Sequence, residues 1–113
     1  MKEIKAIIRP NKLLDVVAEL QKIENLPGVI ISDIKGFGKT NAKDTESKIN
    51  LDGIDYVHKV KLEVVVNNDI VENVVNTIQL NAHTGLKGDG KIFVTSVEDV
   101  IKIRTNERGI EAV

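Results

Sequence analysis

The sequence contains no cysteine and no tryptophan, and only two prolines, two phenylalanines and one tyrosine occur among its 113 residues. Without cysteine there is no disulfide framework, no thiol nucleophile and no thiolate metal site, which is typical of a protein from the cytosol. The formal net charge is only −1. General affinity for nucleic acid or for an anionic membrane needs a marked excess of lysine and arginine, so both are disfavoured.

Long apolar runs are also missing. No segment approaches the ~20 apolar residues that span a bilayer, and residues 1–10 lack the apolar core and cleavage site of a signal peptide. We therefore expect a soluble, cytoplasmic protein without direct membrane insertion, folded as one domain over residues 1–113. His58 and His83 occur singly, and no catalytic set of residues is evident. Neither a metal site nor catalytic residues are expected.

The apolar pattern predicts three long strands and two helices. Strands are expected at 2–9, 29–35 and 60–66, where apolar and β-branched residues dominate. Helical spacing of apolar residues predicts helices at about 12–24, with Asn11 as N-cap, and at about 70–81, with a cap from residues 67–69. Shorter strands are expected at 92–96 and 100–104, and the tail from 106 to 113 has no strong pattern.

Residues 39–58 differ from the rest because polar residues dominate and no helical or alternating period is visible. A structureless stretch this long is rare inside a compact domain and is often a functional loop. We interpret it as a long interaction loop; the alternative is a polar hairpin.

The two halves of the chain resemble each other. Moving residues 4, 6 and 8 forward by 58 positions superimposes them on 62, 64 and 66, and the helical stripes superimpose with the same shift. Two strand–helix–strand units in series predict an α+β, ferredoxin-like βαββαβ fold with both helices on one sheet face. Because the strands look apolar on both sides, the uncovered face is expected to be buried in a homo-oligomer.

A glycine-rich loop over residues 84–91 is the clearest candidate site. Three glycines within six residues allow positive φ and close approach to a ligand, and the loop also carries Lys87 and Lys91. The spacing approaches that of a P-loop, but Ile92 stands where a Mg²⁺-binding Ser or Thr would be needed. Three interpretations stay open: a phosphate site, an ordinary turn, and a nucleotide-hydrolysing or phosphoryl-transfer enzyme. An RNA-binding module ranks last, because few strand aromatics are available for base stacking.

These motifs together resemble the PII signal-transduction proteins of nitrogen regulation. The resemblance runs nearly end to end and is carried by residues 36–39, 59–61, 84–94 and 102–105. It implies a homotrimer that binds ATP or ADP, with Mg²⁺ possible beside ATP, in clefts between subunits. It also implies that a long T-loop (about 38–58) contacts and controls a transporter or metabolic enzyme, so that the protein is a regulator that could be recruited to a membrane transporter. The B-loop would cover about 83–91 and the C-terminal segment about 99–113.

The same resemblance implies the site residues. Gly36, Gly38 and Lys39 would form the base of the T-loop, and Ile8 and Val65 would lie near the adenine. The implied phosphate contacts are Gly88, Asp89, Gly90 and Lys91, joined by Lys102 and Arg104 from a neighbouring subunit.

Two departures from the family pattern predict a changed response. Thr40 stands where the family has a glutamine that helps to hold Mg²⁺ and 2-oxoglutarate. Asp52 stands where some members carry a tyrosine that is modified by uridylylation. Standard 2-oxoglutarate sensing and T-loop uridylylation are therefore not expected.

Overall fold

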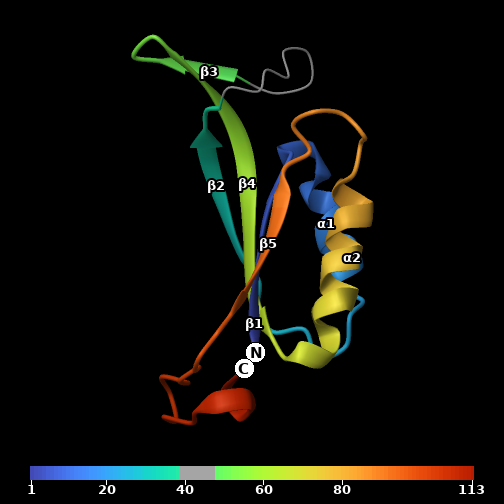
Figure 1. Ribbon diagram of the computed structural model, residues 1–113, viewed down its shortest axis with the longest axis vertical. Helices are drawn as coiled ribbons and strands as arrows, with labels where there is room; N and C mark the ends of the chain where they lie inside the picture. The colour runs from blue at the N-terminus through green and yellow to red at the C-terminus, as the bar shows by residue number, and fades with distance from the viewer. Residues whose placement is uncertain (39–47) are drawn as a thin grey trace.

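The computed structural model describes residues 1–38 and 48–113 and shows an antiparallel sheet with two helices packed on one face (Figure 1). The strand order is β2-β4-β1-β5, with β3 added to β4. The elements are β1 (Lys2–Ile8), α1 (Leu13–Leu20), β2 (Ile30–Gly36), β3 (Lys48–Leu51), β4 (Ile54–Val66), α2 (Val71–Ala82) and β5 (Lys91–Ser96), with short 3₁₀ turns η1 (Pro10–Lys12), η2 (Asn68–Ile70) and η3 (Gly109–Ala112). The predicted βαββαβ fold is confirmed.

The core lies between the sheet and the helices because β1 and β4 place alternate residues on the same face. Ile4, Ala6 and Ile8 of β1 lie opposite Val64, Leu62 and Val60 of β4, and all six are buried. Val16 and Leu20 of α1 and Val74 and Ile78 of α2 cover them. Each of these valine, leucine and isoleucine side chains contributes about 1.5–3 kcal/mol through its removal from water.

The predicted helix limits were partly wrong. α1 ends at Leu20, although residues up to 24 keep helical spacing, because Ile23 packs against the core from a turn instead. Asn11 is not an N-cap but lies inside η1, and no side chain caps either helix. The amide oxygen of Asn68 instead accepts a hydrogen bond from the N-terminal ammonium at 2.9 Å.

The sheet face away from the helices is less apolar than expected. Alternation places Ile7, Val65 and Phe93 there together with charged side chains such as Lys5 and Glu63. The Lys5 ammonium lies 5.5 Å from the centre of the Phe93 ring. This open face is thus mixed, with apolar groups that still lack cover.

Part of the segment expected to be structureless is a β-hairpin. β4 begins at Ile54, six residues before the predicted start, and pairs with β3 across a turn at Asp52 and Gly53. Both turn residues have positive φ, +54° and +75°, as a type I′ hairpin turn requires. The polar-hairpin alternative is therefore correct for residues 48–57. Residues 39–47, which the same prediction covers, lie outside the described part.

The predicted strand at 100–104 was wrong. Only an isolated bridge joins Ile101 to Arg108, and the chain turns between them. The carboxylate of Asp99 closes this segment by accepting the N–H groups of Val100 (2.9 Å) and Gly109 (3.1 Å). The segment lies at the end of the sheet opposite the glycine-rich loop and the hairpin (Figure 1).

Candidate functional site

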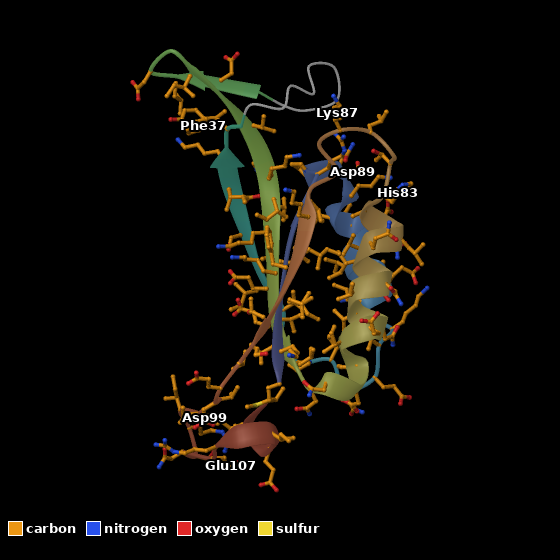
Figure 2. All side chains as sticks on the ribbon, viewed as in Figure 1. Phe37, His83, Lys87, Asp89, Asp99 and Glu107 are labelled. Carbon is orange, nitrogen blue, oxygen red and sulfur yellow. The ribbon has the colours of Figure 1, made fainter. Side chains whose placement is uncertain are left out.

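The glycine-rich loop connects α2 to β5 and is closed around the side chain of Asp89 (Figure 2). One carboxylate oxygen accepts the N–H groups of Thr84 and Gly85, both at 2.9 Å. The other accepts the Thr84 hydroxyl and Nε of Arg9, the latter at 3.0 Å. Partial burial by itself raises the pKa of Asp89, but these hydrogen bonds from Thr84, Arg9 and Gly85 outweigh it and hold that pKa well below its ordinary value. Asp89 therefore holds the loop together as a carboxylate.

Two cations outside the loop hold its carbonyl groups. Arg9, which directly follows β1 and is only 4% exposed, donates from Nη2 to the carbonyl of Lys87 at 2.6 Å. The ammonium of Lys59, on β4, donates to the carbonyl of Gly88. Arg9 is not among the site residues predicted from the sequence. The only local indication of its role is its position at the end of a strongly apolar strand, because a charged residue there is not expected to be exposed to solvent.

The glycines of the loop are required by geometry. Gly85, Gly88 and Gly90 all have positive φ, between +86° and +96°. A Cβ on Gly90 would lie 1.7 Å from the carbonyl oxygen of Ile7, so the loop passes against the end of β1 with no room for a side chain. The predicted backbone freedom of these glycines is confirmed.

A pocket of about 280 Å³ lies between the end of α2, the end of β1 and the loop. It is lined by Ile7, Ile8, Ile78, Gln79, Ala82, His83 and residues 89–92. The side chain of Ile8 is 2% exposed and belongs to the core, whereas Ile7 faces the open side of the sheet beside Lys91. Both isoleucines line this pocket, and the place of Ile8 near the adenine stays a prediction.

Some of the other predicted site residues also lie at the end of the sheet that carries the glycine-rich loop. Gly36 ends β2 opposite Val57, and Gly38 follows two residues later, so both lie at the end of the sheet that carries the loop. Residues 88–91 form the last part of the loop and the start of β5. Lys39 lies outside the described residues, as does Thr40.

Three predicted residues lie at the opposite end of the sheet. Val65 is opposite Glu3, whereas Ile8 is opposite Val60, so five residues of β4, or ~17 Å, separate the two positions. Lys102 and Arg104 belong to the C-terminal segment at that far end, where the Lys102 ammonium lies 3.9 Å from Glu107. Val65 also lines a second pocket there, of about 230 Å³. Within one chain, the predicted site is therefore divided into two halves that do not meet.

The described residues contain no group of three or more His, Asp or Glu side chains placed to hold a metal ion. His58 lies 3.4 Å from the carboxylate of Asp33, and His83 directly follows α2, next to the loop (Figure 2). Among the helices of the same residues, none is long and apolar enough to cross a membrane.

The whole chain is similar to regulatory proteins of nitrogen metabolism. A protein from Azospirillum brasilense named nitrogen regulatory protein P-II is 42% identical over 113 residues, which cover all of both chains. The protein of the same name from Pyropia yezoensis is 43% identical over 112 residues, or 99% of each chain. A homolog from Arabidopsis thaliana is 44% identical over 97% of this chain and 56% of its own length.

The fold agrees with these similarities. The crystal structure of Arabidopsis thaliana PII bound to citrate matches with a TM-score of 0.78 and 44% sequence identity, covering 99% of this chain and 91% of that one. The family model for nitrogen regulatory protein P-II matches residues 1–107. The chain belongs to the nitrogen regulatory protein P-II family.

Proposed function

We propose that this protein is a regulator that binds ATP or ADP in clefts between the subunits of a homotrimer and controls a transporter or enzyme through residues 38–58. One observation carries the proposal: the predicted nucleotide contacts form two separate halves at opposite ends of one chain. A second subunit is the simplest way to bring such halves together. Membership of a family of regulatory proteins supports regulation over phosphoryl transfer.

The phosphate half is the glycine-rich loop. Its carbonyls at Lys87 and Gly88 are turned toward Arg9 and Lys59, which leaves its outer side to N–H groups and to the side chains of Lys87 and Lys91. The carboxylate of Asp89 already accepts four hydrogen bonds within the protein. It therefore contributes by shaping the loop, and Mg²⁺ bound with ATP would take its oxygen ligands mainly from the phosphates.

The second half comes from a neighbouring subunit. Val65 lies on the open sheet face and lines a pocket together with Val100 of the C-terminal segment, the segment that also carries Lys102 and Arg104. Apolar side chains remain uncovered around this face, with Ile30 64% and Phe93 44% exposed. A trimer would cover them and would carry Arg104, with its bidentate guanidinium, to the phosphates held by the next subunit.

The output is the hairpin of residues 48–57 and the segment that precedes it. β4 runs without interruption from the core to the hairpin turn, and its Lys59 contacts the glycine-rich loop. Phe37 is 69% exposed and packs edge-on against Tyr56, with ring centres 5.8 Å apart. A nucleotide that changes the loop would therefore bias a segment that offers apolar side chains to a partner. Because of Thr40 and Asp52, we still expect that standard 2-oxoglutarate sensing and uridylylation are absent.

Isothermal titration calorimetry with ATP, ADP and AMP tests nucleotide binding, and light scattering tests the trimer. We expect ATP and ADP to bind; no binding of any of the three at millimolar concentration overturns the proposal. Phosphate release from ATP with Mg²⁺ that disappears in Lys91→Ala would instead favour an enzyme.

Mixed trimers test whether each site is shared. Lys91→Ala and Arg104→Ala should each abolish tight ATP binding, while Lys22→Ala, which removes an exposed charge on the helix side, should not. When the two binding variants are unfolded together and refolded as an equal mixture, about a quarter of the sites combine an intact loop with an intact Arg104, because each site draws on two subunits. Recovery of no sites would show that each chain binds nucleotide alone.

A further inference from the structure

Lys87 and Gly88 are the central residues of a turn within the glycine-rich loop. Gly88 has a φ of +96°, whereas Lys87 is not among the non-glycine residues with positive φ. Positive φ at the second central position alone is the geometry of a type II turn, and a type I turn differs mainly by a half-rotation of the central peptide. The orientation of the peptide between Lys87 and Gly88 is therefore the variable feature of this loop.

Arg9 contacts that peptide directly. Its Nη2 donates to the Lys87 carbonyl at 2.6 Å while its Nε donates to Asp89 at 3.0 Å, so one guanidinium holds both the turn and the carboxylate that closes the loop. The peptide is trans, and in a trans peptide the N–H points opposite to the C=O. Because the carbonyl points inward to Arg9, the N–H of Gly88 points outward, toward the side where we place the phosphates.

Nothing in the turn itself secures this orientation. Glycine adopts positive and negative φ with similar ease, so the flipped peptide costs little unless another group holds the carbonyl. A flipped peptide would present the Lys87 carbonyl, a partial negative charge, to a phosphate. Arg9 is buried at 4% exposure and is placed to act on the backbone from inside the fold.

We propose that Arg9 is a positioning residue that locks the Lys87–Gly88 peptide in the type II orientation and thereby presents the Gly88 N–H to a phosphate oxygen. It acts through the peptide without touching the nucleotide. The inference rests on the proposed nucleotide function, and it adds a residue from the end of β1 to the determinants of phosphate affinity. A lysine at position 9 has one ammonium and cannot reproduce the two divergent hydrogen bonds of the guanidinium.

The test compares wild type with Arg9→Lys, Arg9→Met and Gly88→Ala, with Lys22→Met as a charge-matched control. Calorimetry measures the affinity for ATP and for inorganic tripolyphosphate, and NMR follows the Gly88 amide and the Lys87 carbonyl carbon. Gly88→Ala disfavours positive φ without altering Arg9, so it tests separately whether the orientation of this peptide sets the affinity, and Arg9→Lys tests the role of Arg9 if Arg9→Met does not fold. We expect Arg9→Lys and Gly88→Ala to bind both ligands about tenfold more weakly, the typical effect of losing a hydrogen bond to a charged group.

The amide signal at ligand saturation separates positioning from mere support of the fold. Wild type and Lys22→Met should show a large shift of the Gly88 amide at saturation, and Arg9→Lys should show a much smaller one. A full shift in Arg9→Lys at saturation, or affinity within twofold of wild type, overturns the proposal.

Failure of the proposed function has a different signature. If wild type binds neither ATP nor tripolyphosphate, the nucleotide function and the phosphate part of the inference both fall. The Lys87 carbonyl signal of the free proteins then decides whether Arg9 holds the peptide at all. A signal that is unchanged between wild type and the Arg9 variants refutes that part too.

Discussion

Replacement of Asp89 by asparagine tests whether this carboxylate holds the glycine-rich loop together. Asparagine keeps one oxygen, which can still accept Arg9 and the Thr84 hydroxyl, but its amide group then faces the N–H groups of Thr84 and Gly85. Two hydrogen bonds are lost, each worth about 1 kcal/mol. In addition, the buried Arg9 loses the negative charge of Asp89 with which it forms an ion pair. With the Asp89 side chain 23% exposed, water offsets part of the loss, so we expect about 3 kcal/mol of destabilisation.

Urea unfolding followed by circular dichroism measures this change, with all proteins at one concentration because association contributes to stability. Asp15→Asn is the matched control, since Asp15 is exposed on the first turn of α1 and should change stability by less than about 0.5 kcal/mol. A loss of less than about 1 kcal/mol for Asp89→Asn would refute the view that this side chain organises the loop.

The pH dependence provides a second check on the same variant. The pKa of Asp89 is lower in the folded than in the unfolded chain, so its ionisation stabilises the fold fully above the unfolded value of about 3.9 and progressively less as the pH falls toward the folded value. The stability difference between wild type and Asp89→Asn should therefore be constant from pH 8 to pH 5 and narrow below about pH 4. A difference that already narrows between pH 7 and pH 5 would contradict the lowered pKa.

Three further substitutions test particular packing relations. Gly90→Ala should lower the free energy of unfolding, measured by urea titration, by more than about 3 kcal/mol, because the new Cβ would lie 1.7 Å from the Ile7 carbonyl oxygen. The control Gly28→Ala, at a position with open space around it, should change this free energy by less than about 0.5 kcal/mol. Ile78→Ala removes a core side chain that is 1% exposed and should lower the free energy of unfolding by about 3–4 kcal/mol in the same titration. The control Leu80→Ala, at an exposed position, should lower it by less than about 0.5 kcal/mol. Similar losses for both would show that α2 does not pack as described. Gly53→Ala strains the hairpin turn, where φ is +75°, by about 1 kcal/mol. Hydrogen exchange of the Tyr56 amide should therefore become about fivefold faster, while the exchange rate of the Leu62 amide stays unchanged. Equal acceleration at both amides would mean that the hairpin unfolds only with the core.

Sequence alone determined the elements whose signal is local. The apolar pattern predicted strands at β1 and β4, and the glycines at 85, 88 and 90 marked a loop with unusual backbone angles. The Asp52-Gly53 pair is an equally local signal for the hairpin, although the polar residues around it have no alternating apolar pattern that would indicate the two strands. Alternation in residues 100–104 was misleading, because Ile103 is 99% exposed and no strand pairs with it in the described chain.

Only the tertiary structure decided how distant residues meet. Arg9 and Asp89 are 80 positions apart, and nothing in either neighbourhood indicates the ion pair, since ion-pair partners are chosen by the fold. Likewise, alternation shows that Ile7 and Ile8 face opposite ways, but the position of the helices determines which one is buried. The division of the predicted site into two halves also follows from strand register, which places Val65 and Ile8 at opposite ends of the same sheet. Composition and periodicity report local preferences, whereas these relations depend on which segments the fold makes neighbours.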